Sequence, residues 1–110
     1  MTDMTPARWQ RTSAYLCDVF GREDATLAAL RADAAAKGLP DIAVSADVGR
    51  LLHVLVRTTR ARAALELGTL GGYSAVWIAR ALAPGGRLIT VELDPERAAF
   101  TRGWFERAGV

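Results

Sequence analysis

The chain has 110 residues, of which 51% are hydrophobic and 24% are charged, and its formal net charge is +2 at pH 7. This length allows one domain at most, and the composition is that of a globular rather than a disordered chain. The basic residues are spread along the chain, so they predict no nucleic-acid surface. The single cysteine, Cys17, excludes an intrachain disulfide, and no apolar run is long enough for a signal peptide or a membrane span. These features predict a cytoplasmic protein that binds neither nucleic acid nor membrane.

The first 41 residues predict a helical segment, 1–41, made of two helices. One helix is expected over 7–20, and its candidate buried side chains are Trp9, Tyr15, Leu16 and Val19. A second helix is expected over 23–37, because Leu27, Leu30 and Ala34 have helical spacing and the stretch 38–40 is a stop signal.

The pattern changes within the remaining residues, 42–110. Ser45 can cap a third helix, whose expected buried stripe is Val48, Leu51, Leu52 and Leu55. His53 lies off this stripe, and a lone histidine is more often a packing residue than a metal ligand. An apolar run over 63–67 predicts a buried parallel strand, and helical spacing returns over 74–82.

A turn rich in glycine and proline over 83–86 precedes the last two predicted elements. These are a strand over 87–92 and a helix that Asp94 and Pro95 open and Gly109 ends. The order predicts an α/β fold, with N-terminal helices followed by the first strand–helix–strand–helix of a Rossmann-like parallel sheet. The pattern stops before a third strand, and two parallel strands need cover on both faces and both edges. We therefore expect either a fragment of a larger fold or a chain that another chain completes.

A glycine-rich stretch between the first predicted strand and the next helix indicates a ligand-binding loop. Residues 66–72 read Glu-Leu-Gly-Thr-Leu-Gly-Gly, and glycine permits positive φ and close approach of a ligand. Glu92 ends the next strand, where an acidic side chain can accept both hydroxyls of an adenosine ribose. Leu70 stands in place of the second glycine of a dinucleotide fingerprint, the one that admits a pyrophosphate. An NAD-dependent oxidoreductase fragment is therefore a disfavoured alternative.

The segment 42–110 resembles the small, metal-dependent O-methyltransferases of the catechol and caffeoyl-CoA type, which are class I S-adenosylmethionine-dependent enzymes. The matching motifs lie at 44–49, 65–74, 84–88, 91–96 and 105–109. The leading helices are also similar to those of bacterial members. The resemblance implies that 42–110 is the N-terminal half of an S-adenosylmethionine-binding Rossmann-like domain.

The same resemblance assigns residues to the amino-acid end of S-adenosylmethionine. The backbone at Val44 and the hydroxyl of Ser74 would hold the methionine carboxylate. The backbone at Gly68 and Thr69, with Glu66 beside it, would line the methionine and its amino group.

Four further residues are assigned to the rest of the cofactor by the same resemblance. Gly72 and Tyr73 would shape the loop against the sulfonium, Glu92 would grip the ribose, and Leu93 would pack on the adenine. The motif carries no base, nucleophile or metal ligand, so we assign no catalytic and no metal-binding residue.

The family's reaction moves a methyl group to an oxygen of a small hydroxylated acceptor, which a divalent cation such as Mg²⁺ binds and orients. The family's metal-binding carboxylates, Asn ligand and catalytic Lys follow the point where this sequence ends. The expected function is thus an O-methyltransferase for a catechol- or phenol-like small molecule, present as a cofactor-binding half that is inactive alone. The alternative from another class is a non-catalytic interaction protein, which would form a homodimer through its N-terminal helices.

We expect Glu92→Ala to weaken S-adenosylmethionine binding sharply, because the ribose hydroxyls would lose their acceptor. Isothermal titration calorimetry of the two proteins measures this loss, and an unchanged affinity would contradict the assignment of Glu92.

Overall fold

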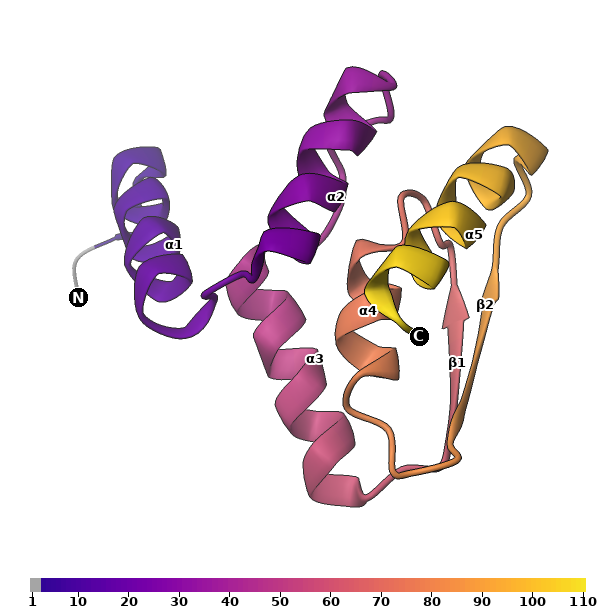
Figure 1. Cartoon of the computed structure of the whole chain (residues 1–110). Helices are drawn as coiled ribbons and strands as arrows, with labels where there is room; N and C mark the ends of the chain where they lie inside the picture. Colours follow the sequence, from indigo (N-terminus) through magenta and orange to yellow (C-terminus); the bar gives the residue numbers. More distant parts are fainter. Residues whose placement is uncertain (1–2) are drawn as a thin grey trace.

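The computed structural model describes residues 3–110 as five helices and a two-stranded parallel sheet (Figure 1). The elements in chain order are α1 (Pro6–Phe20), α2 (Ala25–Ala36), α3 (Ala46–Thr59), β1 (Ala63–Leu67), α4 (Tyr73–Ala79), β2 (Arg87–Val91) and α5 (Pro95–Ala108). The predicted α/β order, with helices ahead of a strand–helix–strand–helix unit, is confirmed.

Local capping signals explain where most helices begin and end. The Asp24 side chain accepts a hydrogen bond from Leu27 N at the start of α2, and Asp94 accepts from Glu96 N and Arg97 N at the start of α5. Gly109, with φ 70°, ends α5 in the left-handed conformation. Ser45 is the N-cap residue of α3, as predicted, but its side chain makes no capping hydrogen bond.

The two strands form a parallel ladder that runs from the pair Ala63–Arg87 to the pair Leu67–Val91. Alternate residues point to opposite faces of the sheet, and only one face is covered. The helices lie on one side of the strands in Figure 1. The uncovered face carries apolar side chains, and Leu65 and Leu67 are 67% and 78% exposed. The prediction of a buried strand is therefore wrong for this face of the sheet.

The core lies between α2, α4 and α5. Leu27 and Leu30 of α2 are buried, as predicted from their spacing, against Val76 of α4 and Trp104 of α5. The indole nitrogen of Trp104 also donates to Asp33 Oδ2 at 2.9 Å, which gives this buried donor a partner. The N-terminal helix α2 thus belongs to the same core as the helices that follow the glycine loop.

A small residue brings α3 against α4. Gly49 is buried in this contact, and His53 Nδ1 lies 3.1 Å from the carbonyl oxygen of Trp77. Ala46, the other buried residue of α3, lies against Gly21 at the end of α1. The predicted apolar stripe is wrong, because most of it faces outward; its exposed members are Val48, Leu51 and Leu55. A glycine faces α4 instead because the broad Trp77 ring occupies the space that a larger side chain would fill.

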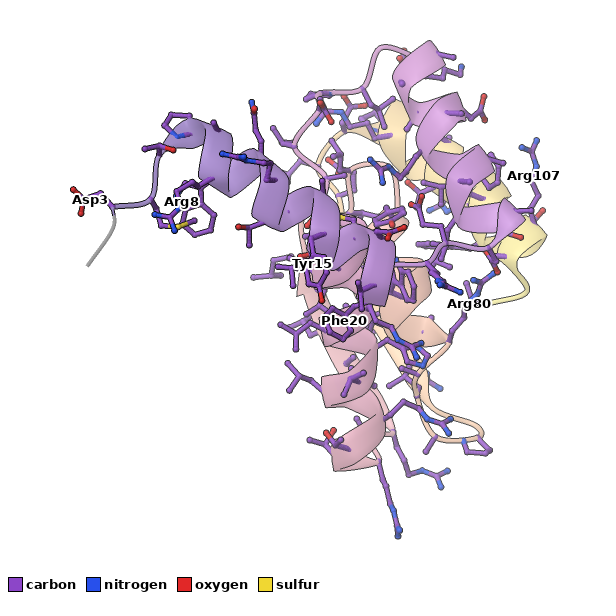
Figure 2. All side chains as sticks on the ribbon, turned by 90° about the vertical axis from the view of Figure 1, so that its left-hand side faces the viewer. Asp3, Arg8, Tyr15, Phe20, Arg80 and Arg107 are labelled. Carbon is purple, nitrogen blue, oxygen red and sulfur yellow. The ribbon has the colours of Figure 1, made fainter. Side chains whose placement is uncertain are left out.

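Helix α1 packs against α3 and buries none of its own residues. Of its predicted core positions, Leu16 is half-buried, whereas Trp9, Tyr15 and Val19 are exposed, so the prediction is wrong for those three. Tyr15 and Phe20 project from α1 in Figure 2. The Cys17 thiol of this helix donates to Asp47 Oδ1 of α3 at 3.3 Å. Among residues 3–110, no helix combines the length and the apolar character that crossing a membrane requires.

We expect Gly49→Ala to lower the free energy of unfolding by about 1–3 kcal/mol, because overpacking forces neighbours out of place. An added Cβ would lie 2.4 Å from atoms of the Trp77 indole. The matched control is Gly103→Ala in α5, whose Cβ meets no atom within 4 Å. The control should raise stability by about 0.5–1 kcal/mol, since alanine is the better helix former. Urea unfolding measures both, and equal effects of the two variants would contradict this account of the α3–α4 contact.

Candidate functional site

A cavity of about 280 Å³ opens at the carboxyl ends of β1 and β2, beside the glycine loop. Open α/β sheets bind ligands at this end of their strands. Of the residues assigned by resemblance, the cavity brings together Val44, Gly68, Thr69, Tyr73, Ser74 and Glu92. The α2–α3 connection, the loop and the end of β2 therefore meet around one space.

Two glycines of the loop have backbone conformations that favour glycine. Gly68 has φ 90° and Gly72 has φ 83°, both in the left-handed region. A Cβ on Gly72 would also lie 2.5 Å from Thr101 Cγ2, so a side chain there would collide with α5. The loop is anchored at both ends, because Gly68 N donates to Val91 O at 3.0 Å and Gly72 N donates to Thr69 O at 2.8 Å.

Glu92 joins the end of β2 to the middle of the loop. Leu70 N donates to Glu92 Oε2 at 2.8 Å, and Asp94 N donates to Glu92 Oε1 at 3.1 Å. These backbone donors, with Asp94 the stronger, hold the pKa of the Glu92 carboxyl below its ordinary value. Leu70 itself has φ 50°, which is uncommon for a residue with a side chain. The carboxylate is thus ionised and aimed across the cavity mouth, and it supports a strained turn of the loop.

Glu66 makes its contacts from the covered face of the sheet. Its Oε1 accepts from Ser74 Oγ at 2.5 Å, and its Oε2 accepts from Thr90 Oγ1 at 2.6 Å. Ser74 lines the cavity and Glu66 lies behind it. The one hydrogen of the Ser74 hydroxyl is therefore donated to Glu66 in this structure.

Tyr73 ties the loop to the N-terminal helices. Its side chain is buried, and its hydroxyl donates to Glu23 Oε1 at 2.5 Å. The Arg31 guanidinium lies 5.5 Å from the centre of the Tyr73 ring and 3.2 Å from Glu23. Burial, followed by the bond to Glu23, raises the pKa of Tyr73 to about 12, so the hydroxyl stays protonated. The segment 1–41 thereby helps to fix the residue that begins α4.

The other assigned residues lie around the cavity rather than on its wall. Glu66 stands behind Ser74, Gly72 is buried under α5, and Leu93 is 96% exposed next to Glu92. The cavity also contains residues that the sequence reasoning did not single out: Ile42, Ala43, Leu70, Gly71 and Arg97. Most of these are neighbours of assigned residues. For Arg97, the available signal is its place in the first turn of α5, which follows Glu92 and the end of β2 directly.

The residues present fit the adenosyl cofactor that the resemblance implies. Gly68 has no side chain that would obstruct the cofactor. The Glu92 carboxylate stands where the ribose would bind, and the exposed Leu93 side chain is free to pack on the adenine. The described residues offer no comparable set of ligands for a metal ion. Within residues 3–110, no cluster of three or more His, Cys, Asp or Glu side chains could hold a metal ion.

Comparisons with known proteins identify the family of the chain. A family model described as O-methyltransferase matches residues 11–110. The chain is 46% identical over 96 residues to a catechol O-methyltransferase of Niastella koreensis, covering 87% of this chain and 43% of that protein. It is 44% identical over 97 residues to a catechol O-methyltransferase of Mycobacterium tuberculosis, covering 88% of this chain and 44% of that protein.

Solved structures give the same result at the level of the fold. The O-methyltransferase from Bacillus cereus, in complex with SAH, superposes with a TM-score of 0.89 at 41% identity, over 94% of this chain and 47% of that one. The O-methyltransferase TomG from Streptomyces achromogenes, in complex with SAM, gives 0.87 at 42% identity, over 98% and 48%. The chain spans about half the length of the relatives that it matches. It belongs to the class I S-adenosylmethionine-dependent O-methyltransferases, in the family that includes the catechol O-methyltransferases.

Proposed function

We propose that this chain is the cofactor-binding half of an S-adenosylmethionine-dependent O-methyltransferase that acts on a small hydroxylated acceptor of the catechol or phenol type. The observation that carries the proposal is the Glu92 carboxylate, held at the mouth of the cavity by Leu70 N and Asp94 N. The relatives named as catechol O-methyltransferases support the acceptor class.

Each end of the cofactor has a candidate partner in this chain. The ionised Glu92 carboxylate accepts hydrogen bonds from the ribose hydroxyls, and the exposed Leu93 side chain covers one face of the adenine. The backbone at Val44, Gly68 and Thr69 surrounds the amino-acid end. Gly72 and Tyr73 set the path of the loop beside the sulfonium, since one is packed against α5 and the other is fixed to Glu23.

The cofactor supplies a methyl group on a positively charged sulfur. When bound, it would offer this methyl group to an acceptor oxygen and leave as S-adenosylhomocysteine, and the acceptor hydroxyl would give its proton to a base. The described residues contribute orientation to this step, because a fixed cofactor presents its methyl group in one direction. The described residues supply no group that activates the acceptor hydroxyl.

The two alternatives differ from this proposal in what they need from the site. An NAD-dependent oxidoreductase needs room for a pyrophosphate where Leu70 lines the cavity with its side chain. A non-catalytic protein that forms a homodimer is favoured by a different observation, the exposed apolar side chains of α1 and of the open sheet face.

Calorimetry with separate ligands tests the proposal. We expect S-adenosylmethionine and S-adenosylhomocysteine to bind the chain, and NAD to bind at least about 100-fold more weakly, because the loop rejects a pyrophosphate. Gly103→Ala, remote from any neighbouring side chain, serves as the control that should keep the wild-type affinity. A preference for NAD would overturn the proposal. A folded dimer that binds neither nucleotide would instead support the interaction protein, and sedimentation analysis identifies that state.

A further inference from the structure

A chain of hydroxyl groups runs behind the wall of the cavity and ends on Glu66. Thr90 Oγ1 donates to Glu66 Oε2 at 2.6 Å, and Thr69 Oγ1 lies 2.6 Å from Thr90 Oγ1. A hydroxyl has one hydrogen to donate. Because Thr90 gives its hydrogen to Glu66, Thr69 must be the donor to Thr90. The direction of the relay is therefore fixed: Thr69 to Thr90 to Glu66.

The register of the sheet brings these groups together. Glu66 of β1 and Thr90 of β2 are paired residues in the parallel ladder, so both side chains rise from the covered face. Both are partly buried, and Thr69 is only 4% exposed. A carboxylate in such a place needs hydrogen-bond donors, and each of its two oxygens has one here, from Ser74 and from Thr90.

The relay controls what the cavity wall presents to a ligand. Ser74 and Thr69 line the cavity, whereas Glu66 and Thr90 stand behind it. Since the Ser74 hydrogen is used on Glu66, the Ser74 oxygen offers lone pairs to the cavity, and a negative charge lies one hydrogen bond behind it. Both features attract the ammonium end of an amino-acid group. A bond from Ser74 to the carboxylate end, which the resemblance implies, requires the Ser74 hydrogen to turn from Glu66 to the ligand.

We propose that Thr90, supported by Thr69, is a positioning residue that fixes Glu66 behind Ser74 and so sets the affinity of the site for the amino-acid end of S-adenosylmethionine. This inference rests on the proposed function. Thr90 touches no ligand in it and acts through Glu66 and Ser74. Without the Thr90 hydroxyl, the Glu66 carboxylate loses one of its two fixed donors and can turn away from Ser74.

The test compares two ligands that share the adenosine part. S-adenosylhomocysteine carries the amino-acid end, and methylthioadenosine lacks it. We expect Thr90→Val to weaken binding of S-adenosylhomocysteine about fivefold to tenfold, in the range of one ordinary hydrogen bond, and to change methylthioadenosine binding less than about twofold. Thr90→Ser, which keeps the hydroxyl, should restore most of the affinity. Thr58→Val, an exposed threonine of α3, is the matched control and should change neither affinity.

Each outcome bears on a different claim. If the wild-type chain binds neither adenosyl ligand, the proposed function fails and this inference fails with it. If the wild-type chain binds both and Thr90→Val weakens both equally, Thr90 has a structural role only and the inference alone is overturned. An unchanged affinity for S-adenosylhomocysteine overturns it as well. Thr69→Val interrupts the relay at its other end, and it supplies the same comparison if circular dichroism shows that Thr90→Val is unfolded.

Discussion

The bond between Leu70 N and Glu92 is the constraint on which the site depends. It joins the middle of the glycine loop to the end of β2 at 2.8 Å, while Gly68 N binds Val91 O one residue earlier on that strand. Leu70 adopts φ 50° against its own preference, and such a conformation persists only where surrounding contacts impose it. The loop is therefore shaped before a ligand arrives, which lowers the entropic cost of binding.

Much of the fold could be predicted because its signals are local. Asp94 and Gly109 act through hydrogen bonds or dihedral angles within a few residues, so the sequence shows them directly. The glycine loop and Glu92 were also predictable, because the end of one parallel strand lies beside the end of the next. The contacts of Glu66 with Thr90 and of Tyr73 with Glu23 were not, since they depend on sheet register and on helix packing.

The predictions of burial failed where the sequence pattern does not show which element packs against an apolar face. The stripe of α3 from Val48 to Leu55 has the right spacing for a core face, yet the Trp77 ring of α4 packs at Gly49, where no side chain is in its way. The prediction for the strands failed in a similar way. An apolar run predicts a strand that is buried on both faces, whereas the helices of the described chain cover one face of the sheet. Amphipathic spacing identifies an apolar face and leaves its neighbour unspecified.

The exposure of helix α1 has a consequence for its local stability. None of its residues is fully buried, although Leu16 and Cys17 are half-buried, and it packs against α3 rather than against the core. Releasing α1 would expose less apolar surface than releasing α2 or α4, so its local opening should cost less free energy than global unfolding does. We therefore expect the amide hydrogens of α1 to exchange with solvent faster than those of α2 and α4, whose side chains form the core.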